Sequence, residues 1–598
     1  MKAFNHIVVA VIVICFPSLL EAQKLTQSQL YPVVMENYNY NRILNGTINK
    51  KIYVFENPFI VNIGALHEEF NEPNGVRNSR ENAKNHFSSL KIVNPNSLLQ
   101  EKTIPISSVL ANLHGTTAEY IHTTDLFIRE NRLVAVYTIA QETDEQTFYA
   151  QELDESGTAV GKPHKLITID IAKGILAQGD TYEIGLKKGE FGNHLNGERA
   201  LSQFRFMLSP DKNNILAFHI FRENKSENSK CKLLVFDKNF TVRFEKIFQN
   251  EYEEGSMSIV EIAVDNNQQL YLLTKRYKTK QEIKQDRAFE DCEYKIHSFN
   301  GKNGESRILS LKQVDQDKNR DIVLSLNQEN EVLLAGTYAS KAVKENRSAF
   351  AGFISSKLKS SESALVDMYR FPIKESRYDQ FYENIRNLPR FAAANLYFRV
   401  PSAIPRKIIP LRNGRFFIVS QAGINQWVSF PPPNNSVFFY YCFDITISLV
   451  NQEGKIEWLT TIPARQNVVT GFNGYIIWNN TFGFTCSVDE KENISIFYSN
   501  SQKNYANGEP KQKDLFGIEL NRGCEDCDGL TYCIVNPEGK IIKNTFLPWD
   551  KDKKERLLSR RGMVTIDNKH YLLAYELKKK YSGNDRNEHN YTIVRVED

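Results

Sequence analysis

One unit recurs along this chain: an apolar run, a short polar turn and a second apolar run. Examples are LVFDKNFTVRFEKIF at 234–248, AVDNNQQLYLLTKRY at 263–277 and ISLVNQEGKIEWLTTI at 447–462. Asn, Asp and Gly stand at the centres of these units, and these residues tolerate the positive φ that tight hairpin turns need. Aromatic and β-branched residues in the flanking runs favour strands. The pattern therefore predicts an all-β protein built from repeated hairpins.

The hairpins are of two kinds, which alternate. The first kind is strongly apolar and is typical of a buried inner hairpin: 126–140, 206–221, 262–277, 322–338, 408–421, 476–498 and 564–577. The second kind is more mixed: 148–166, 232–248, 294–311, 351–371, 438–462 and 515–547. One hairpin of each kind makes a four-stranded sheet, and self-similarity at a spacing of about 55 to 90 residues indicates stacked blades.

Six full pairs and one half pair predict a β-propeller, with seven blades favoured and six or eight as alternatives. The last inner hairpin is followed by one strand, at 591–596, which needs a partner because an open ring would expose a long sheet edge. The apolar segment 52–63 is the expected partner, so that the N- and C-terminal segments close the ring. We expect an N-terminal segment at 23–125 and the propeller at 126–598; two smaller β domains are the alternative.

The start of the chain has the pattern of a signal peptide over 1–22. Lys2 gives a positive charge, 7–20 is largely apolar, and Ala22 offers a small residue before Gln23. The run is short for a membrane span, although an uncleaved signal anchor is the alternative. No later stretch reaches about 18 consecutive apolar residues. The sequence thus predicts an exported protein, either periplasmic, on the cell surface or extracellular, without a transmembrane segment once the signal is removed.

The long connections should crowd one face of the propeller. In a four-stranded blade, strand 2–3 loops and blade-to-blade loops share a face, and long loops on a rigid scaffold often carry function. Two of these segments are rich in aromatic residues. Tyr378, Tyr382 and Arg390 lie in one, and Trp427 and Phe430 lie in the other. We predict that these five residues bind a ligand, because aromatic and Arg side chains anchor binding surfaces.

Two other interpretations of the aromatic segments remain open. The aromatic residues can instead pack their own loops onto the scaffold, and 438–441 has the pattern of the beginning of a strand.

Cys524 and Cys527 form a C-x2-C pair. A structural zinc site normally needs four ligands, and the nearest histidine in the chain is His570. In an exported protein a local disulfide between Cys524 and Cys527 is the stronger prediction, and Cys533 would then join Cys442 or Cys486. The neighbouring acids lack the regular spacing of a calcium loop. We therefore expect no metal and no cofactor.

Catalytic signatures are lacking. There is no H-E-x-x-H, no G-x-S-x-G and no phosphate-binding loop. The histidines that loops can bring together are His67, His114, His122, His194 and His219, and no carboxylate pair can be nominated. Charged residues make up 24% of the chain with a net charge of +4, which gives no case for nucleic acid as a partner.

The repeated hairpins resemble those of exported bacterial β-propeller-like proteins of no assigned activity. The resemblance rests on SPDKNNILAFHIF at 209–221, VDNNQQLYLLTKRY at 264–277 and IVNPEGKIIKNTFLP at 534–548, and it covers roughly 200–598. The motifs describe blades, so the resemblance implies no functional residue. Neither the G-H…W-D signature of WD40 repeats nor the Asp boxes of sialidases are found.

These observations favour an exported binding or scaffold protein that recognises a protein or a glycan through its long-loop face. The alternative is a carbohydrate-active enzyme, a hydrolase or lyase, with its site at the mouth of the propeller channel. A structural part of an envelope complex is a third possibility. We expect binding rather than catalysis.

Overall fold

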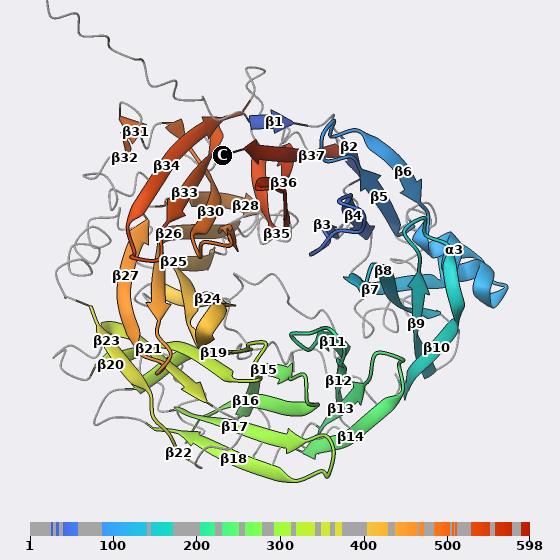
Figure 1. Ribbon diagram of the computed structural model, residues 1–598, viewed down its shortest axis with the longest axis horizontal. Coiled ribbons are helices and arrows are strands. Elements are labelled where there is room, and N and C mark those ends of the chain that lie inside the picture. Colours follow the sequence, from blue (N-terminus) through green and yellow to red (C-terminus); the bar gives the residue numbers. More distant parts are fainter. Residues whose placement is uncertain are drawn as a thin grey trace, which may run out of the picture.

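The computed structural model shows a ring of eight β-sheets arranged as the blades of a propeller (Figure 1). It describes residues 25–27, 31–34, 40–57, 87–139, 145–170, 204–221, 230–249, 257–277, 292–312, 318–340, 349–358, 365–373, 403–428, 437–462, 464, 466–471, 483–502, 505–506, 509–510, 528–549, 556–576 and 588–597. The blades are numbered here in chain order.

Each of the first four blades has a four-stranded antiparallel core that follows the chain from the inside of the ring outwards. Blade 1 contains β3 (Tyr40–Ile43), β4 (Ile52–Asn57), β5 (Ser89–Val93) and β6 (Gln100–Ile104). Blade 2 contains β7 (Ile121–Arg129), β8 (Arg132–Ile139), β9 (Glu145–Leu153) and β10 (Ala159–Asp170). Blade 3 contains β11 (Phe204–Leu208), β12 (Ile215–Phe221), β13 (Lys230–Phe236) and β14 (Val242–Gln249). Blade 4 contains β15 (Met257–Val264), β16 (Gln269–Tyr277), β17 (Cys292–Asn300) and β18 (Ser306–Leu311), with β22 (Leu365–Val366) added in parallel.

The last four blades follow the same order. Blade 5 contains β19 (Lys318–Leu326), β20 (Val332–Ser340), β21 (Ala349–Leu358) and β23 (Tyr369–Pro372). Blade 6 contains β24 (Ala403–Pro410), β25 (Phe416–Val428), β26 (Val437–Val450) and β27 (Ile456–Ile462), with β28 (Gln466–Gly471) added. Blade 7 contains β29 (Thr485–Val488), β30 (Ile494–Asn500), β33 (Gly529–Val535) and β34 (Ile541–Pro548). Blade 8 contains β35 (Arg556–Ile566), β36 (Lys569–Glu576) and β37 (Glu588–Glu597), with β1 (Leu25–Gln27) and β2 (Tyr31–Val34) along β37.

The remaining elements are short. A two-stranded pair joins β31 (Tyr505–Ala506) to β32 (Glu509–Pro510), and two 3-10 turns, η1 (Ala118–Tyr120) and η3 (Arg412–Gly414), precede strands. The helix α3 (Ile106–His114) leads from blade 1 to blade 2 and buries Ile106, Leu110 and Ala111 against both. No described helix is long and apolar enough to cross a membrane.

The all-β propeller prediction is confirmed, but the favoured blade number was not. Eight blades form the ring, because residues 40–104 fold into a blade of their own. The segment at 52–63 was expected to close the ring, yet Ile52–Asn57 is the second strand of that extra blade. The N- and C-terminal segments do close the ring, through β1 and β2 on β37. The helix α3 was not predicted.

The apolar core is divided into wedges between neighbouring sheets. One cluster joins blades 1 and 2 through Leu90 and Leu133, and another joins blades 8 and 1 through Val54 and Leu573. Similar clusters fill the other six interfaces. Because each blade can bury its faces only against its neighbours, the ring is stable as a whole rather than blade by blade.

The hairpin turns explain why these sequences form these strands. Seven of them start with Asp or Asn, whose side chain accepts the backbone N–H group four residues later and in most of them also the one two residues later. Asp237 Oδ1 accepts from Asn239 N (2.8 Å) and Thr241 N (3.0 Å), and Asn451 Oδ1 accepts from Glu453 N (3.1 Å) and Lys455 N (2.9 Å). The fourth position has positive φ in these turns: Gly157, Phe240, Gln268, Asn330, Gly454, Glu492 and Gly539.

These turns gather on one side of the ring, the turn face, where they also join neighbouring blades. Lys102 Nζ donates to Ser156 O (2.8 Å), Ser355 Oγ to Gly454 O (2.7 Å) and Trp458 Nε1 to Pro537 O (2.9 Å). In each case a side chain of one blade binds the backbone of the next turn. On the opposite side, called the connection face below, the second strand of each blade ends and the third begins.

Candidate functional site

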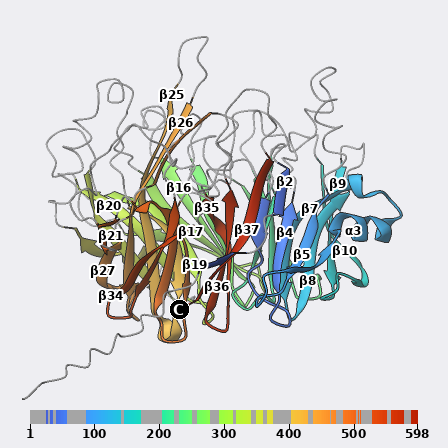
Figure 2. The ribbon, with the colours of Figure 1, turned by 90° about the horizontal axis from the view of Figure 1, so that it is seen from above.

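Blade 6 continues past the ring into a second small sheet. Its strands β25 and β26 have 13 and 14 residues and rise beyond the other strands on the connection face (Figure 2). Residues 416–421 pair with 445–450 inside the blade. The register then shifts between Gln421 and Gly423, and 423–428 pair with 437–442 beyond it. Such a bulge bends a strand and redirects it.

A third strand completes this extension. β27 pairs with the blade half of β26, and β28 pairs with its outer half, from Cys442↔Gln466 to Val437↔Gly471. The extension, called the ribbon below, therefore consists of residues 423–428, 437–442 and 466–471 as three antiparallel strands.

The base of the ribbon is tied to blade 7. Gln466 is buried (2% exposed), its Nε2 donates to Gly483 O (3.0 Å) and Ser499 O (3.0 Å), and its Oε1 accepts from Gly483 N (2.9 Å). Ser499 Oγ in turn accepts from Leu558 N of blade 8 (2.7 Å). A buried amide with both ends satisfied fixes its backbone, so the ribbon starts from an anchored point.

The ribbon carries no charge. Residues 416–443 and 466–488 contain no Asp, Glu, Lys or Arg, although charged residues make up 24% of the chain. The ribbon strands are instead rich in aromatic residues: Trp427, Phe438, Phe439, Tyr440 and Tyr441. They also carry amides: Asn425, Gln426, Gln466 and Asn467. This composition differs from that of the solvated blade edges.

Of the predicted binding residues, one falls on the described backbone. Trp427 lies in β25 at the register position opposite Phe438 of β26. The expectation that 438–441 begins a strand is confirmed, since β26 starts at Val437. Tyr378, Tyr382, Arg390 and Phe430 lie outside the described residues. The binding role of all five stays a prediction.

The cysteine prediction is corrected in part. Cys524 and Cys527 lie outside the described residues, so their disulfide stays a prediction. Cys533 pairs with neither Cys442 nor Cys486, because both Cys533 and Cys486 are free and buried. Both lie opposite Ile496 of β30 in the strand register, Cys486 in β29 on one side and Cys533 in β33 on the other. Burial raises the pKa of the Cys533 thiol to about 12, which keeps it protonated.

The structure does not bring together the predicted histidines that it describes. His114 ends α3, where its Nε2 lies 2.7 Å from Tyr137 Oη and its ring contacts Tyr149. His219 lies in β12 between blades, and burial followed by the charge of Lys232 lowers its pKa to about 4. His122 lies in β7, while His67 and His194 lie outside the described residues.

One buried histidine, His570, has a set of polar and aromatic contacts that were not predicted from the sequence. His570 of blade 8 is buried (5% exposed), with Nδ1 3.1 Å from Thr565 Oγ1 and 3.5 Å from Ser487 Oγ. Its Nε2 lies 3.4 Å from Tyr532 Oη, and its ring packs on Phe497. Apart from Thr565, its partners come from strands of blade 7 that are far away along the chain, so no local motif could reveal it. The cluster lies in the wedge between blades 7 and 8, where it joins the two sheets.

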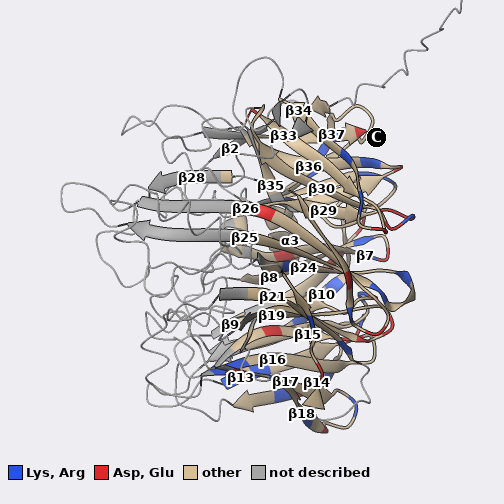
Figure 3. Ribbon diagram, turned by 90° about the vertical axis from the view of Figure 1, so that its left-hand side faces the viewer, with Lys and Arg blue, Asp and Glu red and all other residues tan. Residues whose placement is uncertain are grey.

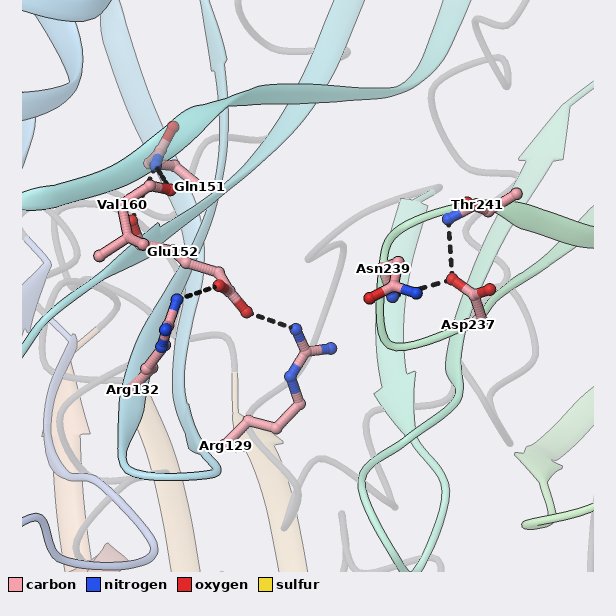
Figure 4. A network of polar contacts seen from close by, with 8 residues as sticks. All are labelled: Arg129, Arg132, Gln151, Glu152, Val160, Asp237, Asn239 and Thr241. Carbon is pink, nitrogen blue, oxygen red and sulfur yellow. Dashed lines mark hydrogen bonds and ion pairs between the residues drawn. The ribbon is translucent and has the colours of Figure 1, made fainter.

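Two clusters of charged side chains lie where neighbouring blades meet. Arg129, whose side chain is 3% exposed, donates to Glu152 (2.8 Å), and the same carboxylate accepts from Arg132 (2.9 Å; Figure 4). The Arg129 guanidinium also lies 4.9 Å from the centre of the Phe240 ring in blade 3. Between blades 1 and 2, Arg42 pairs with Asp125 and donates to Leu126 O (2.8 Å).

The described residues contain no group of three or more His, Cys, Asp or Glu side chains that could hold a metal ion. Lys and Arg are interspersed with Asp and Glu on the turns of the turn face (Figure 3). That mixed face is typical of a solvated surface, whereas the ribbon is set apart by its lack of charge.

Comparisons with known proteins identify similar solved structures but no family for this chain. No protein-family model matches the chain, and no curated protein matches it. Among solved structures, the polysaccharide lyase Uly1 is 9% identical with a TM-score of 0.33, over 80% of this chain and 90% of that one. The WD40 domain of SCAP from fission yeast is 9% identical with a TM-score of 0.33, over 96% and 98%.

A protein of unknown function from Bacteroides caccae is 10% identical with a TM-score of 0.22, over 62% of this chain and 90% of that one. At such low identities and TM-scores, none of these likenesses bears on the activity.

Proposed function

We propose that this chain is an exported binding protein that recognises a protein or a glycan through the ribbon on its connection face. The observation that carries the proposal is the projection of an uncharged, aromatic three-stranded sheet from a closed ring. Exposed sheets usually carry charges that discourage association. A strand segment without charged residues and with many aromatic residues favours binding, because aromatic residues are frequent anchors of binding surfaces and neutral groups cost less to desolvate than charged ones.

The contacts of the described polar clusters favour binding over catalysis. Arg129 binds Glu152 and covers Phe240 of the next blade, Arg42 binds Asp125 of the next blade, and the ring of His570 contacts Tyr532 of blade 7. A catalytic group must instead reach a reacting atom of a bound substrate. The role of these clusters is therefore to hold the ring that displays the ribbon.

The test uses the mature chain, from Gln23 onward, on an array of glycans and in a pull-down from its own envelope fraction. We expect a specific ligand whose binding weakens at least about ten-fold in Trp427→Ala, since an aromatic anchor typically contributes about 2 kcal/mol or more. Tyr120→Ala, at an exposed position of η1 away from the ribbon, is the matched control. Binding that is equal in both variants would refute the ribbon as the contact surface.

A further inference from the structure

The ribbon combines three features that together narrow the chemistry of its ligand. It has no charged residue, it carries aromatic rings, and it carries side-chain amides beside them. Asn425 and Gln426 directly precede Trp427 in β25, and Asn467 lies opposite Tyr441 in the register of β26 and β28. Aromatic rings offer flat apolar faces, while amides donate and accept hydrogen bonds without carrying charge.

The lack of charge excludes one class of ligand. A polyanion such as an acidic polysaccharide is bound mainly by Lys and Arg, which form charge-assisted hydrogen bonds with carboxylate or sulfate groups. Neither residue occurs within 416–443 or 466–488. An ionic ligand would lose part of its hydration on this surface without gaining an opposite charge.

The backbone of the ribbon argues against a lipid bilayer. Residues 423–428 of β25 pair with β26 on one side, and no described strand pairs with them on the other, because β24 meets β25 no further than Ala403↔Ala422. Hydrocarbon leaves such edge N–H and C=O groups without partners, so open sheet edges do not occur at membrane depth. A ligand with many hydroxyl groups can satisfy them.

We infer that the ligand of the ribbon is a neutral polysaccharide, whose sugar rings stack on the aromatic residues and whose hydroxyls bond the amides and the edge of β25. This inference rests on the proposed function, since it requires that the ribbon be the contact surface. Hydroxyl groups match the neutral amides, and apolar sugar faces match the aromatic rings. Recognition then depends on stacking and on neutral hydrogen bonds, which salt screens little.

The test measures the dissociation constants of the mature protein for two neutral polysaccharides, laminarin and mannan, and for two acidic ones, alginate and hyaluronan. Each is measured by affinity electrophoresis in 20 mM and 500 mM NaCl, with phosphatidylcholine vesicles assayed by co-sedimentation. We expect binding to a neutral polysaccharide that changes less than two-fold with salt. Trp427→Ala should weaken it at least ten-fold, and Trp427→Phe, which keeps a ring, less than about three-fold.

The outcomes separate this inference from the proposed function. Binding only to the acidic polysaccharides with a steep loss in high salt, or only to the vesicles, overturns the neutral ligand. If Trp427→Ala weakens that binding, the ribbon stands as the contact surface. If the protein binds a neutral polysaccharide equally strongly in Trp427→Ala and in Tyr120→Ala, both the inference about the ligand and the proposal that the ribbon is the contact surface are overturned. Absence of binding to every probe overturns the neutral ligand, and the envelope pull-down then decides the proposed function.

Discussion

At the scale of single residues, the buried ion pair of Arg129 in blade 2, beside the interface with blade 3, should contribute to stability. Arg129→Met removes a buried guanidinium that binds Glu152 and covers Phe240. Loss of one partner of a buried pair usually costs about 3 to 5 kcal/mol. Because Glu152 keeps Arg132, we expect a loss of about 2 to 3 kcal/mol in the free energy of unfolding, measured by urea denaturation.

The matched control is Arg132→Met, which removes the other guanidinium on the same carboxylate. The Arg132 side chain is 47% exposed, and exposed ion pairs contribute about 0 to 1 kcal/mol. Equal losses in the two variants would contradict the view that burial of Arg129 makes its ion pair important.

A second residue-scale effect is a dependence of stability on pH. Burial, and then the charge of Lys232, lowers the pKa of His219 to about 4, from about 6.5 in an unfolded chain. Between these values the unfolded chain binds a proton that the folded chain does not. The folded state is therefore most stable above pH 6.5, and this contribution is lost as the pH falls towards 4.

For His219 the loss between pH 7 and pH 4.5 should be about 2 to 3 kcal/mol, at about 1.4 kcal/mol per pH unit. In His219→Gln, which has no titrating group at this position, the difference between the free energies of unfolding at the two pH values, measured by urea denaturation, should shrink by that amount. His297→Gln is an informative comparison, because burial and Lys295 also lower the pKa of His297 to about 4. An unchanged pH dependence in His219→Gln would show that this residue does not titrate between these pH values.

At the scale of elements, substitution of a turn glycine should destabilise the protein most where the glycine touches the next blade. Gly454 has φ +85, and a Cβ there would lie 2.8 Å from Lys357 N in blade 5. Gly304 has φ +74 with nothing within 4 Å of a Cβ. Gly304→Ala should cost only the left-handed backbone strain of about 1 to 2 kcal/mol.

Gly454→Ala should lower the free energy of unfolding by at least about 1 kcal/mol more, because the blade interface must shift as well. Urea denaturation of both variants measures the difference. If the two glycines are equally tolerant, the turns do not hold the blades together.

The hairpins themselves were predictable because their turn chemistry is local. Runs such as NQEGK at 451–455 contain both the Asx acceptor and the residue of positive φ, and the structure confirms hairpins at these sites. Other turns place Phe240, Gln268 and Glu492 at positive φ. There the Asx side chain and the paired strands impose a conformation that the residue itself does not favour.

The first blade was not recognised because its strands give weak signals. β6 reads QEKTI with four exposed residues, which is the pattern of an outermost strand with solvent on both sides, and β3 has only four residues. The aromatic segment at 426–441 was recognised by composition alone. The pairing of this segment with a third strand, β28, involves residues further along the chain. Such pairing between distant residues leaves no local pattern in the sequence.

At the scale of the whole molecule, stability should depend on the joint between the two ends of the chain. Leu25–Gln27 pairs with β37 through three residue pairs and Tyr31–Val34 through four, and Leu25 also packs on the apolar cluster between blades 7 and 8. Removal of 23–34 would leave the edge of β37 uncovered along its length. Lost pairing alone should cost on the order of 5 kcal/mol, at about 0.5 to 1 kcal/mol per pair.

We expect the truncated chain to have a lower urea midpoint and to form higher oligomers in size-exclusion chromatography, since an open strand edge recruits other chains. A synthetic peptide covering 23–36 should restore the midpoint in a concentration-dependent manner, because it binds only the folded ring. The control peptide carries Thr26→Pro and Val33→Pro, which remove backbone donors from both strands. If the truncated chain remains monomeric with an unchanged midpoint, blade 8 is stable with β35, β36 and β37 alone, and the two ends of the chain do not hold the ring closed.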